Sequence, residues 1–114
     1  MRISRSADGG KNWSTPVKTP VKGYPQHLRV LKDGRLLATY GYRYPPYGVR
    51  ACISRDGGKT WDIDKEIILQ NNGISDNLGY PVSIELENGE VLCVYYMNSA
   101  EHGDCFIEGA FFRP

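Results

Sequence analysis

Short apolar runs separated by polar turns make up most of the chain, and one arrangement of them occurs twice. Both Gly23–Tyr42 and Gly79–Met97 run from Gly-Tyr-Pro through a short apolar stretch to a turn, and then through a second apolar stretch that contains tyrosine near its end. The turns hold Asp33-Gly34 in the first segment and Asn88-Gly89 in the second. Such dipeptides between β-rich runs are a strong hairpin signal, because the turn needs positive φ at its central residues. The pattern therefore predicts two equivalent β-hairpins.

Two more strand-like runs follow the first hairpin. Val49–Ser54 is one and Asp62–Leu69 is the other, and helical periodicity is scarce throughout the chain. Residues 23–72 therefore predict four strands within about 50 residues. Repeated four-stranded units of this size are typical of β-propellers, in which each unit is one blade.

A second repeat lies between the strand-like runs. Ser-x-Asp-Gly-Gly-Lys-x-Trp occurs at 6–13 and again 48 residues later, at 54–61. The short polar side chains can accept hydrogen bonds from amides of their own turn, the glycines permit positive φ, and Trp61 can cover the hairpin. A calcium loop is excluded, because alternating acidic ligands and a terminal glutamate are missing. We expect structural turns between third and fourth strands, built from Ser6, Asp8, Gly10, Trp13, Ser54, Asp56, Gly58 and Trp61.

These repeats predict an all-β fold of about two four-stranded antiparallel blades, cut out of phase. Residues 1–22 hold the end of one blade, 23–72 a complete blade, and 73–114 a blade that lacks its fourth strand. The two prolines of Ser14–Lys22 suit an outermost edge strand, because proline cannot donate to a ladder. Such a chain leaves β edges open at both ends, so we expect it to need either more chain or copies of itself.

Composition narrows the possible functions. A net charge of +1 with no block of like charges gives no reason to expect a nucleic-acid partner. No apolar run approaches the roughly 20 residues of a membrane span, and no signal-peptide pattern follows Met1, so we expect a soluble chain. The sequence does not assign it to a cellular compartment. Cys52, Cys93 and Cys105 lack metal-site spacing, so neither a metal nor a cofactor is expected.

The two motifs resemble the Asp-box (BNR) repeats of sialidases, also called neuraminidases. The chain also has, in the order found in the last blades of a sialidase, Arg43, Arg50, the motif at 54–61, Gly79–Pro81, Glu87–Glu90 and Tyr95-Tyr96. The resemblance implies a six-bladed propeller, of which this chain resembles the C-terminal two blades. It further implies an exo-sialidase-like glycoside hydrolase that acts on terminal sialic acid or a related 2-keto sugar acid.

The resemblance also implies roles for individual residues. Arg43 matches the third of the family's three carboxylate-binding arginines, and Tyr80 matches the nucleophilic tyrosine. The remaining catalytic groups belong to earlier blades, so the active site is incomplete in this chain alone. Strand counting places Arg43 and Tyr80 on the face opposite the two motifs. We expect substrate-binding side chains around them from Tyr24, Tyr42, Asp76 and Tyr96.

The residues near Arg43 and Tyr80 also have alternative roles. Asp76 or Glu101 is an alternative proton-transfer or orienting group. The tyrosines have a plain alternative role as packing residues against Pro45 and Pro46. Arg50 is expected to be a structural ion-pair partner, and His27 and His102 ordinary loop or edge residues.

Three interpretations of the whole chain remain open. It is part of a sialidase-like hydrolase, a non-catalytic carbohydrate-binding or scaffold propeller, or a fragment that folds only by self-association. The expected partner is a glycan with a terminal acidic sugar. For the isolated chain we expect a homo-oligomer, in which the strand at Trp13–Val21 of one copy completes the last blade of the next and three copies close a ring. The alternative is that the rest of a longer chain fills the gap.

Overall fold

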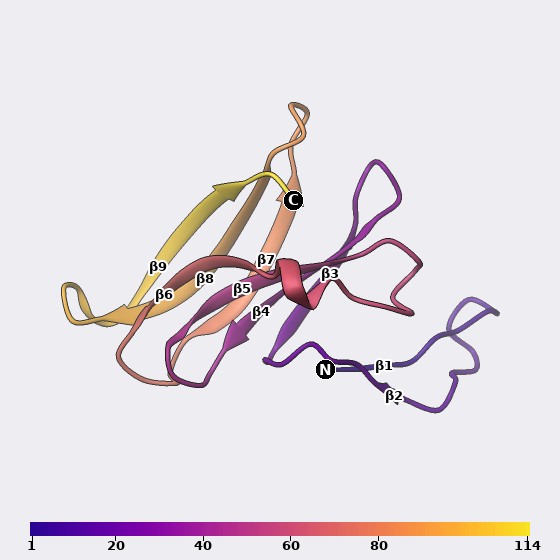
Figure 1. The fold of residues 1–114 in the computed structure, drawn as a ribbon, viewed down its shortest axis with the longest axis horizontal. Coiled ribbons are helices and arrows are strands. Elements are labelled where there is room, and N and C mark those ends of the chain that lie inside the picture. Colours follow the sequence, from indigo (N-terminus) through magenta and orange to yellow (C-terminus); the bar gives the residue numbers. More distant parts are fainter.

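The computed structural model describes residues 1–103 and 105–114. Within them the chain is all-β, with nine strands in three antiparallel sheets (Figure 1). No helix in this part of the chain is long and apolar enough to cross a bilayer. In chain order the elements are β1 (Arg2–Ile3), β2 (Val17–Lys18), β3 (Gln26–Val30), β4 (Leu36–Tyr42), β5 (Tyr47–Ser54), the 3-10 helix η1 (Ile63–Lys65), β6 (Ile67–Gly73), β7 (Gly79–Glu85), β8 (Val91–Ser99) and β9 (Gly103–Phe112).

The sheets follow the chain without crossovers. The first sheet pairs β1 with β2, the middle sheet has the order β3-β4-β5-β6, and the last has the order β7-β8-β9. Both predicted hairpins are confirmed. The turn between β3 and β4 has Gly34 at φ 86°, and Asp33 accepts the amide of Arg35 at 3.0 Å. The turn between β7 and β8 has Gly89 at φ 80°, so each glycine supplies the positive φ that the turn requires.

The fourth strand of the middle sheet begins later than predicted. The expected run was Asp62–Leu69, but β6 starts at Ile67, because η1 takes up the residues before it. This short helix turns the Glu66 side chain inward, where its carboxylate accepts a hydrogen bond from Arg50 at 2.6 Å. The backbone bonds of η1, from Lys65 N to the Asp62 carbonyl and from Glu66 N to the Ile63 carbonyl, therefore delay the start of the strand.

The expected edge strand near the N-terminus is also shorter than predicted. Only Val17 and Lys18 of Ser14–Lys22 pair as a strand. Pro16 and Pro20 flank this pair, and neither has an amide hydrogen to donate to a ladder. The prolines thus limit β2 to two residues at the edge of its sheet.

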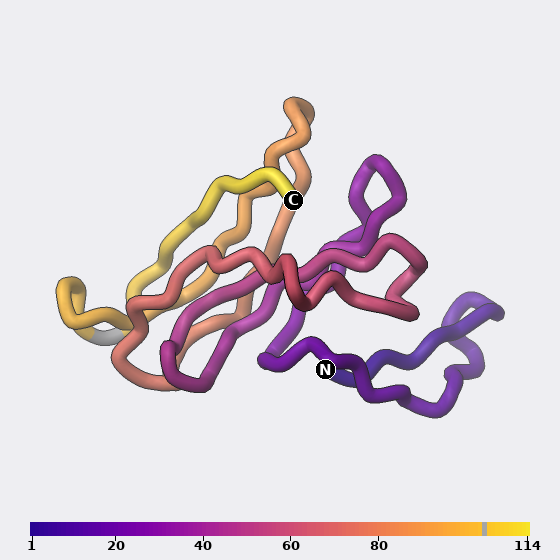
Figure 2. Tube along the Cα trace, in the orientation of Figure 1, coloured from indigo at the N-terminus to yellow at the C-terminus, as the bar shows by residue number. Residues whose placement is uncertain are grey.

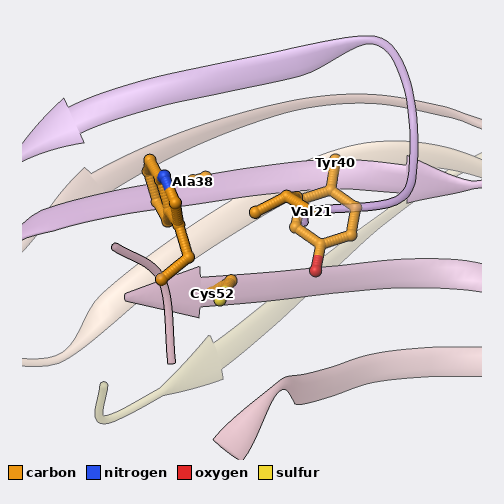
Figure 3. Close-up of a cluster of buried hydrophobic side chains, with 5 residues drawn as sticks. Val21, Ala38, Tyr40 and Cys52 are labelled. Atoms are coloured by element: carbon orange, nitrogen blue, oxygen red, sulfur yellow. The ribbon is translucent and has the colours of Figure 1, made fainter. Parts of the chain in front are cut away.

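Buried side chains fill both faces of the middle sheet. On one face, Val21 of the N-terminal segment packs with Ala38, Tyr40 and Cys52 (Figure 3). On the other face, Leu37 and neighbouring apolar residues pack against the sheet β7-β8-β9. The two larger sheets therefore stack face to face, as alternating strands with one apolar side require.

The two repeated motifs, here called the motif turns (residues 6–13 and 54–61), form the same hydrogen bonds. In the second, Ser54 Oγ accepts the Gly58 amide at 2.7 Å and the Asp56 carboxylate accepts the Thr60 amide at 2.8 Å. In the first, Ser6 Oγ accepts the Gly10 amide at 2.8 Å, and Asp8 accepts the Asn12 amide at 2.9 Å. The second turn lies between β5 and β6, the third and fourth strands of the middle sheet.

The tryptophans of the motif turns have different surroundings. Trp61 is 7% exposed and belongs to the core beside the N-terminal segment, as expected for a cover over the hairpin. Trp13 is 64% exposed, and its indole nitrogen donates to the Gly10 carbonyl at 3.0 Å. The motif turn therefore keeps its hydrogen bonds whether or not the tryptophan is buried.

The motif turns predict a loss of stability in acid. The backbone amides of Asn12 and Thr60 hold the pKa values of Asp8 and Asp56 at about 2, below the ordinary 3.8. These depressed pKa values stabilise the folded chain above about pH 4, and the contribution is lost as the pH falls toward 2. Urea unfolding at several pH values should show this decline, with a shallower one in Asp56→Asn. The variant Asp64→Asn is the control. If it makes the loss of stability with falling pH as shallow as Asp56→Asn does, the assignment to Asp56 is contradicted.

The loops divide between two opposite edges of the stacked sheets. Because successive strands run antiparallel, the hairpin turns after β3 and β7 share one edge with the second motif turn. The connections at 43–46, 74–78 and 100–102 lie at the other edge (Figure 2). Arg43 and Tyr80 belong to this second edge, on the side opposite the motif turns, as strand counting predicted.

Candidate functional site

The candidate site forms where the end of β4 meets the start of β7. Gly41 and Gly79 face each other there, and a Cβ added to Gly79 would lie 3.1 Å from the Gly41 Cα. Gly79 has φ 115°, a conformation that side chains disfavour. This glycine contact lets two backbones from different sheets approach closely. It brings Arg43, which directly follows β4, beside Tyr80, which follows Gly79.

Arg43 is held by hydrogen bonds and by two aromatic rings. Its Nε donates to the Leu78 carbonyl at 2.9 Å, and its Nη2 donates to the Tyr96 hydroxyl at 3.3 Å. The guanidinium carbon lies 5.3 Å from the centre of the Tyr24 ring and 5.4 Å from that of Tyr80. Both distances suit cation–π contacts, which orient the guanidinium plane. We call Arg43, Tyr24, Tyr80 and Tyr96 the arginine cluster.

The positive charge of this cluster is not neutralised by a neighbouring carboxylate. Arg43 has no ion-pair partner among residues 1–103 and 105–114, whereas Arg50 and Arg35 are paired with Glu66 and Asp33. Two of its five N–H donors have protein acceptors, which leaves others for a ligand. A planar fork of this kind matches a carboxylate, so the cluster can bind an anion.

Tyr80 is presented to solvent in a strained conformation. It is 63% exposed and has φ 49°, a region that non-glycine residues rarely occupy. Its ring stacks on that of Tyr96, with centres 5.8 Å apart. Within the described residues its hydroxyl has no hydrogen-bond partner, so no carboxylate in this part of the chain serves it as a base. Strain of this kind is common at functional sites.

One buried asparagine organises the loop beside the cluster. Asn98 is 1% exposed, and its Oδ1 accepts the amides of Ile74 and Ser75 at 2.8 and 3.1 Å. Its Nδ2 donates to the Asn77 carbonyl at 2.6 Å. The Asn77 side chain then accepts the Tyr96 hydroxyl at 3.2 Å. Asn98 therefore fixes the loop that holds Tyr96 and supplies the Leu78 carbonyl to Arg43.

The structure brings together four of the six residues expected to act on a ligand. Arg43, Tyr80, Tyr24 and Tyr96 form the cluster, but Tyr42 does not join it. The ring of Tyr42 lies 3.4 Å from the guanidinium carbon of Arg50, because consecutive strand residues point to opposite faces. Asp76 is exposed in the neighbouring loop and makes no ion pair with Arg43.

Arg50 has the structural role predicted for it. It pairs with Glu66 at 2.6 Å, and Glu66 also accepts a short hydrogen bond from the Tyr40 hydroxyl. Burial, together with this bond to Glu66, raises the pKa of Tyr40 well above its ordinary value. Burial likewise raises the pKa of the Cys52 thiol to about 11. The network is a neutralised part of the core and not a second anion site.

The two histidines and Glu101 lie outside the arginine cluster. His27 bridges the stacked sheets, with its Nδ1 at 3.1 Å from Ser83 Oγ, and burial lowers its pKa. Glu101 and His102 line a separate open cleft of about 490 Å³ beside Gln70 and Glu108. No group of three or more histidine, cysteine or acidic side chains is placed to hold a metal in the part of the chain that the structure describes.

The residues that hold the arginine cluster in position were not predicted from the sequence. Gly41, Leu78, Asn77 and Asn98 position the cluster, and none was among the expected site residues. Gly41 and Gly79 lie 38 residues apart in the chain, so no local pattern indicates their contact. The buried Asn98 sits in an apolar strand, where a polar residue indicates a specific hydrogen-bonding role.

Comparisons with known proteins identify a solved structure of similar fold but assign no function. No family model matches the chain, and no curated protein matches it. It is similar to a crystal structure of a protein of unknown function from Dyadobacter fermentans DSM 18053, with 37% sequence identity and a TM-score of 0.82. The match covers 96% of this chain and 30% of that one. The chain therefore spans about 30% of the length of the solved structure that it resembles.

Proposed function

We propose that this chain is part of a sialidase-like Asp-box β-propeller whose Arg43 binds the carboxylate of terminal sialic acid or a related 2-keto sugar acid. Two features support the propeller assignment. The middle sheet has the four antiparallel strands of a blade, with a motif turn between the third and fourth. The next sheet stacks on its face as an adjacent blade does. In this proposal residues 1–22, 23–72 and 73–114 belong to three successive blades.

The observation that carries the ligand assignment is the oriented guanidinium of Arg43, which has no ion-pair partner within residues 1–103 and 105–114. Its position is fixed by the Leu78 carbonyl and by two tyrosine rings. Fixing the guanidinium in advance lowers the entropy lost when a carboxylate binds to its remaining N–H groups. The exposed ring of Tyr80 beside it offers a surface for the face of a sugar.

In this proposal Tyr80 is the nucleophile that attacks the anomeric carbon next to that carboxylate. A neutral phenol avoids the repulsion that a carboxylate nucleophile would meet there, and sialidases use tyrosine in this way. The phenolic proton must pass to a base as the bond to carbon forms, and the leaving oxygen must receive a proton from an acid. In this proposal both of those groups come from outside residues 1–114. This chain supplies the carboxylate-binding and nucleophile part of the site.

A second candidate is a carbohydrate-binding propeller without catalysis. It is favoured by one observation, namely that the Tyr80 hydroxyl has no basic partner within the described residues. The two candidates share the Arg43 site and differ in turnover. Hydrolysis of an aryl glycoside of sialic acid by a protein that contains this chain together with the remaining blades would favour the enzyme, whereas binding without hydrolysis by that same protein would favour the second candidate.

Binding of free N-acetylneuraminic acid, measured by calorimetry, tests the role of Arg43. Arg43→Lys keeps the charge but removes the planar fork, and we expect affinity to fall by about tenfold or more. Arg55→Lys is the matched control, since Arg55 lies in the motif turn at the other edge and should bind as the wild type does. The wild-type protein should bind the methyl ester of the sugar more weakly than the free acid, by the same factor of about tenfold or more. Equal binding by Arg43→Lys and wild type would refute the assignment.

A further inference from the structure

The imidazole of His27 joins β3 of the middle sheet to β7 of the last sheet. The Ser83 amide donates to Nδ1 of His27 at 3.3 Å, and the Ser83 hydroxyl lies 3.1 Å from the same nitrogen. Ser83 is 2% exposed, and His27 is half-buried. An amide N–H can only donate, so Nδ1 carries a lone pair and the proton of the neutral ring is on Nε2. The contact therefore requires the neutral form of His27.

This contact lies close to the arginine cluster along both strands. Tyr24 comes three residues before His27, and Tyr80 comes three residues before Ser83. The rings of these two tyrosines are the ones that contact the guanidinium of Arg43. A change in the spacing of β3 and β7 at His27 therefore changes the spacing of the two rings that orient Arg43.

The charged neighbour that acts on His27 lies on its own strand. Arg29 comes two residues later on β3, and its Nη1 donates to the Ser83 carbonyl at 3.5 Å. On the strands packed against β3, the carboxylate of Glu85 accepts the Lys32 amide at 2.7 Å. The other titratable groups there are tyrosines, namely Tyr40 and Tyr42 on β4 and Tyr80 on β7. No carboxylate on β3, β4 or β7 is therefore hydrogen-bonded to the His27 ring to stabilise its charged form.

Protonation reverses the role of the ring nitrogen at this contact. Burial, and secondly the positive charge of Arg29, lower the pKa of His27 below its ordinary value of 6.5. As the pH falls through this lowered pKa, Nδ1 gains a proton and becomes a donor that faces the Ser83 amide, which is also a donor. Because the pKa is lowered by folding, the contact stabilises the fold above the ordinary pKa, and this contribution is lost in acid.

We propose that His27 is a positioning residue for the arginine cluster and couples carboxylate binding at Arg43 to pH. The neutral ring holds β3 and β7 at the spacing that places Tyr24 and Tyr80 against the guanidinium. The charged ring separates the strands at this point, and the guanidinium loses its fixed orientation. The site then binds an acidic sugar best at neutral pH and releases it in acid. The choice of a sugar acid as ligand rests on the proposed function, whereas the coupling of His27 to Arg43 does not.

Calorimetry with N-acetylneuraminic acid tests the pH dependence, in a protein that contains this chain together with the remaining blades. From about pH 7.5 to about pH 4.5 the sugar carboxylate stays ionised and the motif turns keep their stability. Wild-type affinity is expected to fall about fivefold over this range, the usual effect of one lost hydrogen bond. His27→Asn keeps an acceptor near the position of Nδ1 but does not titrate, so its affinity should stay constant. An equal fall in this variant and in wild type would overturn the proposal.

His102→Asn is the matched control for this variant. His102 is exposed and lies outside the arginine cluster, so its replacement should leave the wild-type fall in affinity unchanged. A constant affinity in His102→Asn as well would assign the pH dependence to histidines in general, and would contradict the role of His27.

Nuclear magnetic resonance of the wild-type protein tests the coupling without the sugar. The imidazole nitrogen shifts should place the proton of neutral His27 on Nε2. The Nε–H signal of Arg43, which donates to the Leu78 carbonyl, should shift with the same midpoint as the His27 ring, whereas that of Arg50 should not. If the protein binds no sugar at any pH, the sugar assignment fails and this signal still decides the coupling. An Arg43 signal that stays constant through the His27 titration would overturn the proposal.

Discussion

Replacing Gly79 by alanine is expected to destabilise the chain by about 3 kcal/mol, because two costs coincide at this position. The residue has φ 115°, and the new Cβ would lie 3.1 Å from the Gly41 Cα in the other sheet. To relieve this contact the start of β7 must move away from the end of β4. That movement separates Tyr80 from Arg43, so the variant should also lose sugar-acid affinity. Urea unfolding and calorimetry measure the two effects.

Gly34→Ala separates the cost of conformation from the cost of the close contact. Gly34 has φ 86°, but an added Cβ would meet no atom within 4 Å. This variant should therefore lower the free energy of unfolding by only about 1 kcal/mol, the penalty for a left-handed conformation. It should also leave the arginine cluster intact. Equal destabilisation by the two variants would show that the contact with Gly41 contributes nothing.

Replacing Asn98 by alanine is expected to cost about 2–3 kcal/mol, because it removes a buried amide and leaves backbone groups without partners. The amides of Ile74 and Ser75 both lose their acceptor, and the Asn77 carbonyl loses its donor. The loop that positions Leu78 and Tyr96 should then loosen. Urea unfolding measures the cost, and hydrogen exchange should show faster exchange at the amides of Ile74 and Ser75.

Asn72→Ala is the control for this variant. Asn72 is exposed on β6, and its loss should change stability by less than about 0.5 kcal/mol. Hydrogen exchange in the strands of the middle sheet should be the same in both variants. A loss of protection spread evenly over the chain in Asn98→Ala would mean that the residue supports the fold as a whole and not this loop.

The features that could be predicted from the sequence are those determined by neighbouring residues. Asp33-Gly34 and Asn88-Gly89 define their hairpins because the turn conformation depends on only two residues. The motif turns were predicted for the same reason, since Ser54 and Asp56 bond amides of residues four positions ahead. Counting strands from these turns was enough to place Arg43 and Tyr80 on one edge.

Features that depend on distant residues were missed or misplaced. The pairing of Glu66 with Arg50 joins residues 16 positions apart, and no local pattern indicates that ion pair. The approach of Gly41 to Gly79 joins two sheets and is visible only after they stack. Tyr42 is a different case. Strand alternation alone separates it from Arg43, but the expectation grouped residues by loop and not by strand face.

The hydrogen bonds of the motif turns have a consequence for the order of folding. Each joins groups four residues apart, so forming it closes a very short loop and loses little chain entropy. The sheet contacts between β3 and β7 instead join residues more than 50 positions apart. We therefore expect both motif turns to form on the timescale of an isolated hairpin, before the sheets stack. Each would then act as a local nucleus that sets the strand after it alongside the strand before it.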